Sequence, residues 1–269
     1  MIRSLFKYTL QLADTALLAG HRNSEWTGHG PVLEQDIAIS NIALDQVGQA
    51  RYFYQYAADQ CTGYPPLIRE FYSPMLVSKE GNIDEDDIAY LRDATEFYNL
   101  LLAELPRGDW AVTVLKQFFL SAYQLCVYEK LVNGPDARLS AIAGKAVREL
   151  LYHQRWSGEW VIRLGDGTEE SRRRLLAALE QLWPYCGEFF LASPGENELA
   201  ANGCIAAPEG LRTEWLDRIA TAFRPAGLDL PPAGGWTQQG GKHGQHTEHL
   251  GYLLAEMQYL QRAYPGCEW

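Results

Sequence analysis

The chain has 269 residues, of which 47% are hydrophobic and 21% are charged, and its formal net charge is −11. This composition is ordinary for a globular protein and is sufficient to fill a hydrophobic core. A negative chain offers no basic surface for the phosphates of nucleic acid, and it is also poorly suited to anionic lipid. We therefore expect no nucleic-acid partner and no membrane association.

The N-terminal apolar stretch is interrupted at helical spacing by Lys7, Gln11 and Asp14, so it predicts an amphipathic helix and not a signal peptide. No run of 18 apolar residues occurs, so no membrane span is expected. The five cysteines are odd in number and form no Cys-x-x-Cys pair. Reduced thiols in the cytoplasm are the simplest interpretation.

Four long helices are predicted, over about residues 4–22, 32–60, 110–132 and 136–164. The second contains no proline and would span roughly 43 Å, a length typical of helix bundles. A connection rich in Gly and Pro follows it over residues 61–83, and then a further helix is predicted over about 85–104. Asp109 is the expected cap of the third long helix.

The rest of the chain predicts shorter helices, over about residues 169–191 with a bend near Pro184, over 209–223, and over 247–263 after an irregular segment. No strand with period-2 alternation and no repeat is found. The sequence therefore predicts an all-α protein with a single domain over 1–269. Its bundle core is expected at about 4–164, with accessory helices and a docked tail at about 165–269.

A four-helix bundle of this size is a common frame for a dimetal centre, which needs a carboxylate on two helices and Glu-x-x-His on the other two. The six histidines stand at positions 21, 29, 153, 243, 246 and 249. The residues three positions before them are Leu18, Trp26, Leu150, Gly240, His243 and His246. None of these is acidic, so the count of ligands excludes a standard dimetal site.

Four stretches carry a resemblance to a known family. They are Glu25-Trp26-x-Gly28-His29-x-Pro31-x-Leu33-Glu34, Asn41-Ile42-x-Leu44-Asp45-x-x-Gly48-Gln49-Ala50-Arg51, Asn99-Leu100-Leu101-Leu102, and the tail GGKHGQHTEHLGYLLAEMQYLQRAYPG over 240–266. The tail is the most specific of them. Over essentially its whole length the chain resembles the C-type subunits of phenylacetyl-CoA 1,2-epoxidases, the bacterial phenylacetate-degrading oxygenases.

The resemblance implies a ferritin-like four-helix bundle with additional helices and an extended C-terminal segment. It also implies a non-catalytic, structural role beside a homologous catalytic di-iron protein, the A-type subunit, in a heteromer that we expect to be a dimer of heterodimers. A reductase that carries FAD, NADPH and an iron–sulfur cluster would complete the complex, together with the B-type subunit. No cofactor is expected on this chain itself.

The resemblance further implies that the A-type subunit's metal-ligand positions are degenerate here. The pattern Asp-Glu-x-Gly-His of its second helix corresponds to Asp45-Gln46-Val47-Gly48-Gln49, and Glu-x-x-His of its fourth helix to Leu150 and His153. The remaining two acidic positions fall near Ala16 and Ser121. Glutamine is neutral and cannot supply the charge that an iron pair requires, but it can hydrogen-bond across a core. We expect Gln46 and Gln49 to do so, with His153 or Asp45 as partners; a mononuclear metal held by His153 and glutamines is the alternative.

Three other groups of residues have a functional and a structural interpretation. His243, His246 and His249 are either metal ligands of a free-standing enzyme or packed residues of a docked tail with Thr247 as its N-cap. Trp26, His29 and Glu34 indicate a structural turn more than a catalytic pair. The run Arg172-Arg173-Arg174 indicates a solvated helix face, with contact to the phosphates of coenzyme A as the alternative. A free-standing storage or binding protein remains a third hypothesis.

Overall fold

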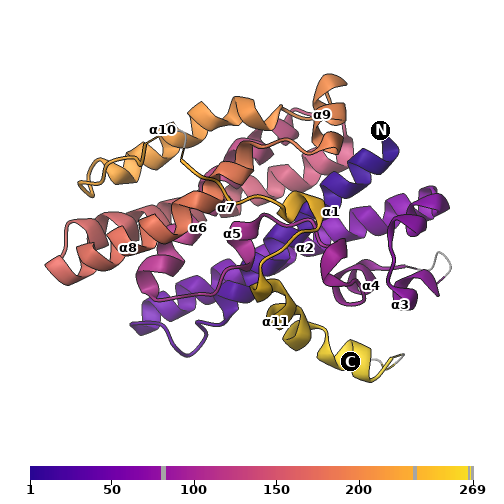
Figure 1. The fold of residues 1–269 in the computed structure, drawn as a ribbon, viewed down its shortest axis with the longest axis horizontal. Helices are drawn as coiled ribbons and strands as arrows, with labels where there is room; N and C mark the ends of the chain where they lie inside the picture. Colours follow the sequence, from indigo (N-terminus) through magenta and orange to yellow (C-terminus); the bar gives the residue numbers. More distant parts are fainter. Residues whose placement is uncertain (80–82, 233–234, 266, 268–269) are drawn as a thin grey trace.

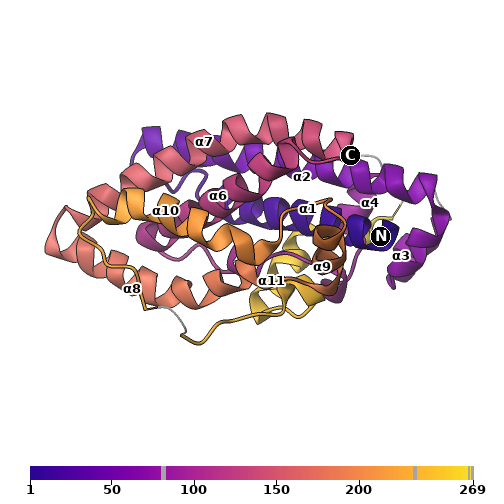
Figure 2. The same cartoon turned by 90° about the horizontal axis from the view of Figure 1, so that it is seen from above.

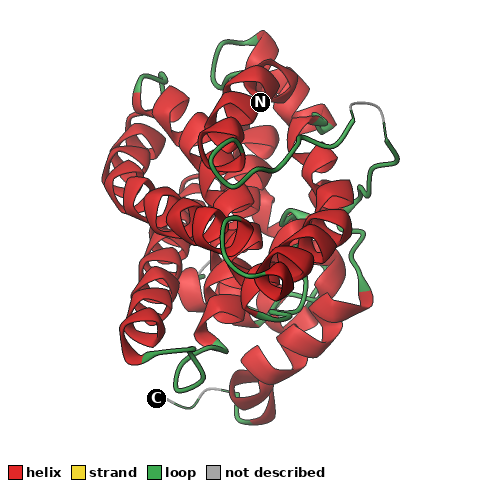
Figure 3. Cartoon of the chain, turned by 90° about the vertical axis from the view of Figure 1, so that its left-hand side faces the viewer, coloured by secondary structure: helices red, strands yellow, loops and turns green. Residues whose placement is uncertain are grey.

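The computed structural model describes all residues except 80–82, 233–234, 266 and 268–269, and the described part consists of helices and loops without a strand (Figure 3). The all-α prediction is therefore confirmed. Gly81 and Gly266, which belong to the predicted connection and the tail signature, lie outside the described residues. No described helix is both long enough and apolar enough to cross a membrane.

Four long helices dominate the molecule (Figure 1), and their bounds agree with the predicted ones to within three residues. They are α1 (Ile2–Ser24), α2 (Leu33–Gly63), α6 (Trp110–Val132) and α7 (Ala137–Gly165). The helix α1 packs closely along α2, and α6 packs closely along α7, so the frame is two helical hairpins. Asp109 caps α6 by accepting a hydrogen bond from the Val112 backbone N–H at 3.0 Å, as predicted.

The prediction of one continuous helix over 85–104 is wrong. The segment instead contains α4 (Glu85–Tyr90), the short 3₁₀ helix η2 (Ala94–Glu96) and α5 (Leu101–Glu104), with extended backbone between them. Three backbone N–H groups that a helix would have used internally bind side chains from other elements. They belong to Tyr98, Leu100 and Leu101, which donate to Asp14 Oδ2 (2.8 Å), Thr15 Oγ1 (3.2 Å) and Glu188 Oε2 (2.7 Å).

The C-terminal part differs from the prediction in its details. α8 (Glu169–Cys186) continues through Pro184 and then tightens into the 3₁₀ helix η3 (Gly187–Phe190). The predicted last helix is divided into α11 (Glu248–Met257) and α12 (Tyr259–Ala263). A helix α9 (Pro194–Ala201) was not predicted, although Ser193 and Glu196 form a capping box that marks its start. The other elements are η1 (Pro65–Glu70), α3 (Pro74–Val77), η4 (Pro208–Leu211), α10 (Arg212–Phe223) and η5 (Gly241–His243).

A fully buried ion pair connects α1 with the segment that follows α4. Arg92 donates to both carboxylate oxygens of Asp14, and neither side chain is exposed to solvent. The Tyr54 hydroxyl of α2 donates to the same carboxylate at 2.6 Å, and the guanidinium stacks 4.1 Å from the centre of the Phe97 ring. Because its hydrogen-bonding groups are well satisfied, this charged network can be kept inside the core.

The two hairpins meet along a polar seam between α2 and α7, which lie side by side along one long edge of the molecule (Figure 2). The seam is a series of hydrogen bonds at successive helical turns. They join Tyr52 to Lys145 (2.5 Å), Gln49 to Glu149 (2.9 Å), Asp45 to His153 (2.9 Å), and Gln35 to both Trp156 (2.9 Å) and Trp160 (2.7 Å). The contact between α2 and α7 is therefore largely polar, and its apolar part is a small cluster in which Trp156 of α7 packs with Ile39 and Ile42 of α2.

Candidate functional site in the bundle core

A closed cluster of three neutral amides occupies the core between α1, α2 and α6. The Asn23 Nδ2 donates to Gln46 Oε1 at 2.8 Å and to Gln117 Oε1 at 2.7 Å, and the Gln46 Nε2 donates to Gln117 Oε1 at 3.1 Å. All three side chains are buried. Gln46 was predicted to hydrogen-bond across the core, and this is confirmed. Its partners Asn23 and Gln117 were not predicted.

Gln49 and His153 lie in the polar seam and not in the amide cluster. Gln49 donates to Glu149, which directly precedes the degenerate position Leu150, and His153 pairs with Asp45. The expectation that the two glutamines bond to His153 or Asp45 is therefore wrong, because Gln46 bonds to Asn23 and Gln117 and Gln49 bonds to Glu149. The Nδ1 atom of His153 and the Oε1 atom of Gln49 are buried without a hydrogen-bond partner. Both side chains therefore hydrogen-bond only across the α2–α7 seam, and they do not share a ligand-binding point with Gln46.

The three remaining predicted positions are filled by small or apolar side chains. Ala16 and Leu150 are fully buried in the hydrophobic core. The Ser121 hydroxyl donates back to the Gln117 carbonyl at 2.8 Å, so it is used within its own helix. None of the six degenerate positions hydrogen-bonds to another one of the six among the described residues.

The donor set does not fit a di-iron centre. Such a centre needs several carboxylates and two imidazoles that face one another across the bundle. Asp45 and Glu149 are the acidic side chains that hydrogen-bond to the degenerate positions His153 and Gln49, so each already has a partner in the seam. Across the described ranges, no group of three or more His, Cys, Asp or Glu side chains is arranged to hold a metal ion.

The histidines of the tail occupy separate environments. Both ring nitrogens of His246 are engaged, Nδ1 with Glu104 at 2.8 Å and Nε2 with the Phe97 carbonyl at 2.9 Å. His243 is exposed, whereas His249 is half-buried and contributes its backbone carbonyl to Arg22 at 3.2 Å. The structure therefore gives the tri-histidine metal site no geometric support, and the docked-tail interpretation holds, with Thr247 as the N-cap of α11.

Three buried carboxylates attach the tail to the rest of the protein. Glu188 accepts hydrogen bonds from the backbone N–H groups of Gly240 and Gly241, and Glu104 accepts one from Thr247. Burial raises the pKa of Glu188, and its backbone donors only partly oppose this shift. The third carboxylate belongs to Glu196, which forms a buried ion pair with Lys242 at 3.0 Å.

The glycines of the tail explain why its sequence is so specific. A Cβ atom on Gly241 would lie 2.1 Å from the Asn99 carbonyl oxygen. On Gly244 it would lie 2.3 Å from the Thr95 carbonyl oxygen, and this residue has a φ of 73°. Only glycine allows both the close approach and the left-handed backbone. The sequence alone offered no sign of these contacts beyond the density of glycines.

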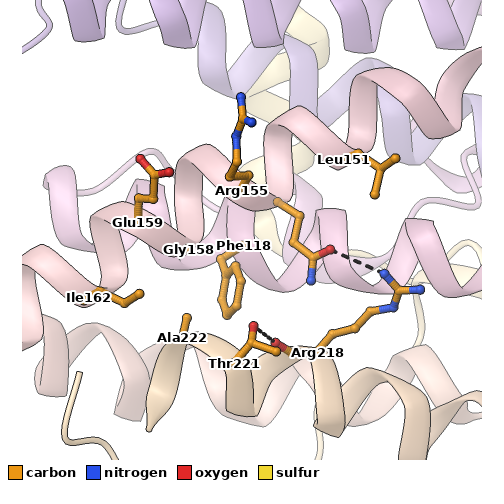
Figure 4. Close-up of a pocket in the computed structure, with 10 residues that line it drawn as sticks. Phe118, Leu151, Arg155, Gly158, Glu159, Ile162, Arg218, Thr221 and Ala222 are labelled. Atoms are coloured by element: carbon orange, nitrogen blue, oxygen red, sulfur yellow. Dashed lines mark hydrogen bonds between the residues drawn. The ribbon is translucent and has the colours of Figure 1, made fainter. Parts of the chain in front are cut away.

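Two hollows in the surface contain charged residues, and most of these residues are already paired. A cavity of about 540 Å³ lies between α1, α9 and the tail, where Arg3 and Lys7 pair with Glu70, and Lys242 pairs with Glu196. A groove of about 370 Å³ lies between α7 and α10 (Figure 4). Figure 4 shows the Phe118 ring between these two helices. Arg218 in this groove pairs with Glu129 at 2.6 Å. Neither hollow brings together a nucleophile, a base and an orienting group.

Lys116 is a buried amine that the sequence analysis did not single out. Its ammonium group donates to the carbonyl oxygens of Leu105 (2.7 Å) and Pro106 (3.2 Å), which attaches the α5–α6 loop to α6. Burial and, to a smaller extent, the nearby charge of Arg22 lower its pKa to about 7. The side chain points to a loop and not to a cavity for substrate, so we assign it a structural role.

The other clusters singled out from the sequence have structural contacts. Trp26 packs against Trp110 and donates to Thr113 at 2.8 Å, which closes one end of the bundle. His29 and Glu34 are exposed and flank this turn. Arg173 and Arg174 both pair with Glu170 on the surface of α8, which agrees with a solvated helix face.

The comparisons with known proteins point to one family. A family model described as "Phenylacetic acid catabolic protein" matches residues 1–269. The chain is also 40% identical over 268 residues to the protein named as the C subunit of 1,2-phenylacetyl-CoA epoxidase in Escherichia coli (strain K12), and the match covers 100% of both chains. Identity at this level over the full length is retained only between members of one protein family. The chain therefore belongs to the phenylacetic acid catabolic protein family.

Proposed function

We propose that this chain is the structural, non-catalytic C-type subunit of a phenylacetyl-CoA 1,2-epoxidase complex. The observation that carries this proposal is the cluster of Asn23, Gln46 and Gln117, which fills the bundle core with neutral amides. The full-length similarity to a protein named as the C subunit of such an enzyme supports the same conclusion. In this proposal the chain has a ferritin-like fold, with its bundle core over 4–164 and residues 165–269 packed against it as part of one domain.

The reaction of the complex would take place on another polypeptide. A homologous A-type subunit would hold the di-iron centre, which activates dioxygen so that one oxygen atom enters the ring of phenylacetyl-CoA and the other leaves as water. A reductase subunit with FAD and an iron–sulfur cluster would supply the two electrons from NADPH. Together with the B-type subunit, the present chain would pair with the A-type subunit in a dimer of heterodimers. It would hold the di-iron helices of that partner in their working geometry.

The five cysteines support a cytoplasmic complex. All five are free thiols in the structure, and burial raises the pKa of Cys61 and Cys126 to about 12. Thiols of this kind are protonated and unreactive at neutral pH, as expected for structural residues in a reducing compartment.

Metal analysis tests the proposal directly. We expect the isolated chain to contain no stoichiometric iron, and the complex with the A-type subunit to contain about two irons per heterodimer. Replacement of Gln46 or Gln49 by alanine should leave the iron content of the complex unchanged, because these amides would not be ligands. About two irons bound to the isolated chain, or a loss of iron from the complex in either variant, would refute a non-catalytic role.

The two rival hypotheses make different predictions. A free-standing enzyme that uses His243, His246 and His249 requires imidazoles that converge, and His246 has both nitrogens engaged elsewhere. A free-standing storage or binding protein would be purified from its native source without a partner. The proposed scaffold requires co-purification with a subunit of similar size that has intact Glu-x-x-His motifs.

A further inference from the structure

The N-terminal half of α2 carries an exposed apolar stripe. Leu33, Ile37 and Leu44 have 72%, 52% and 70% of their surface exposed, and Val47 has 38% exposed. We call these four residues the α2 stripe. Single exposed apolar residues are common in soluble proteins, but several on one face of one helix usually indicate a binding surface.

The spacing of the α2 stripe indicates what kind of element it binds. With Ser40 included, its positions 33, 37, 40, 44 and 47 follow steps of four, three, four and three residues. This alternation keeps one face of a helix in line with a second helix, as in a coiled-coil seam. The stripe is about 21 Å long, which corresponds to roughly four turns of a helix. The geometry favours another long helix over a loop or a flat sheet.

Gly48 extends this face without a side chain. A Cβ atom added at this position would contact nothing within 4 Å, so the glycine is not required by packing inside this chain. Glycine in the middle of a helix is destabilising relative to alanine. A partner helix that approaches the α2 backbone closely at this point would account for it.

The exposed side of α7, which packs along α2, is basic, although the chain as a whole has a net charge of −11. Arg148 and Arg155 are exposed there and form no ion pair among the described residues. Tyr152, with 38% of its surface exposed, lies between them and interacts with the guanidinium of Arg155. A partner that covers this face should therefore present acidic residues next to its apolar stripe.

The face formed by α2 and α7 is large enough for a stable complex. The two helices have 31 and 29 residues and lie side by side. Each is therefore about 45 Å long and about 10 Å wide, so their joint outer face measures roughly 900 Å². About 800 Å² per partner is typical of a specific protein–protein interface.

We propose that the α2 stripe docks onto a long amphipathic helix of the di-iron subunit, with the basic side of α7 facing acidic residues of that subunit. This assignment rests on the proposed function and adds the surface through which it acts. A homologous subunit has long bundle helices of its own and is the occupant that fits. A second copy of this chain fits less well, because two molecules that each carry a charge of −11 repel one another.

Replacement of Leu44 by glutamate tests the docking surface in the complex reconstituted with the A-type subunit. A charge in the middle of an apolar helix seam should weaken the affinity by about 100-fold or more. The matched control is Leu176→Glu on α8, whose side chain is 45% exposed and does not belong to the stripe. We expect this control to retain wild-type affinity. Circular dichroism and thermal unfolding establish that both variants remain folded.

The charge reversal of Arg148 and Arg155 to glutamate tests the basic side of α7 separately. We expect the double variant to associate more slowly with the A-type subunit, and we expect its association rate constant to lose its dependence on salt concentration. The control Lys130→Glu on α6 should leave the rate constant and its salt dependence unchanged. The inference is overturned if Leu44→Glu binds the A-type subunit with wild-type affinity. It is also overturned if the isolated wild-type chain forms a homodimer that Leu44→Glu dissociates. If the wild-type chain itself does not bind the A-type subunit, the proposed function fails; if it binds and Leu44→Glu binds equally well, only the docking surface is wrong.

Discussion

His246 is the tail residue whose buried side chain ties the attachment of the tail to pH. Its two nitrogens each face an acceptor, the Glu104 carboxylate and the Phe97 carbonyl oxygen, so the doubly protonated ring satisfies both. Burial acts to lower the pKa of His246, but the hydrogen bond to Glu104, its negative charge and the Phe97 carbonyl together outweigh burial and raise it.

This raised pKa predicts that the attachment of the tail depends on pH. A group that binds its proton more tightly in the folded state contributes its full stabilisation below its unfolded pKa of about 6.5 and loses it as the pH rises through the folded pKa. We expect hydrogen-exchange protection factors in α11, which are corrected for intrinsic exchange, to be highest below about pH 6.5 and to fall as the pH rises through the raised pKa of His246. The step should disappear in His246→Gln and persist in His249→Gln. A tail whose protection does not change with pH in the wild type would contradict this assignment.

At the residue scale, the sequence predicted that Gln46 and Gln49 are buried and polar, but their expected partners His153 and Asp45 pair with each other instead. It could not predict Asn23 and Gln117, because they are separated by 94 positions and belong to different helices. Helical periodicity gives the face of one helix but not its register against another. The assignment of the six degenerate ligand positions remains a prediction.

At the scale of elements, the segment over 85–104 and the tail over 240–250 depend on one another. The tail covers residues 95–101 closely enough that Gly241 and Gly244 face their carbonyl oxygens. The predicted helix over 85–104 failed because its backbone groups bind side chains of α1 and η3, which lie far away in the sequence. Local propensity favoured a helix, and tertiary hydrogen bonds override it.

Two substitutions by alanine separate the role of the tail glycines from helix propensity. Gly244→Ala should destabilise the docked tail by about 2 kcal/mol or more, since the new Cβ meets the Thr95 carbonyl and the φ of 73° is unfavourable for alanine. Gly251→Ala lies in α11 in open space and should stabilise that helix by about 0.5–1 kcal/mol. Hydrogen exchange of α11 measures both. Equal effects of the two substitutions would show that the close approach at Gly244 is unimportant.

At the scale of the whole molecule, the sequence predicted the four long helices to within three residues, because their apolar periodicity and caps are local signals. It did not predict that the two hairpins meet along a polar seam. The seam depends on the register between α2 and α7, which no single helix encodes. Short elements such as α3 and α5 could not be predicted from the apolar periodicity either, because each has four residues and spans only about one helical turn.

The buried pair of Arg92 and Asp14 should contribute to the stability of the entire fold, because it joins α1 and α2 to the segment after α4. Asp14→Asn leaves the Arg92 charge buried without its counter-ion, and we expect a loss of about 3–5 kcal/mol in the free energy of unfolding. Asp59→Asn is the control, because its pair with Arg138 is exposed and should contribute less than about 1 kcal/mol. Urea unfolding of the two variants provides the comparison, and similar midpoints would show that the buried pair is dispensable.

The attachment of the tail to Glu104, Glu188 and Glu196 has a consequence for biosynthesis. These three acidic side chains emerge from the ribosome well before their partners in the tail. Gly240, Gly241 and His246 supply hydrogen bonds to these carboxylates, and Lys242 supplies the opposite charge. Until residues 240–247 arrive, the partly formed bundle has to keep these carboxylates hydrated, so it remains open at this side. A chain that stops before residue 240 would therefore expose an incompletely closed interior, which makes it recognisable to chaperones and proteases.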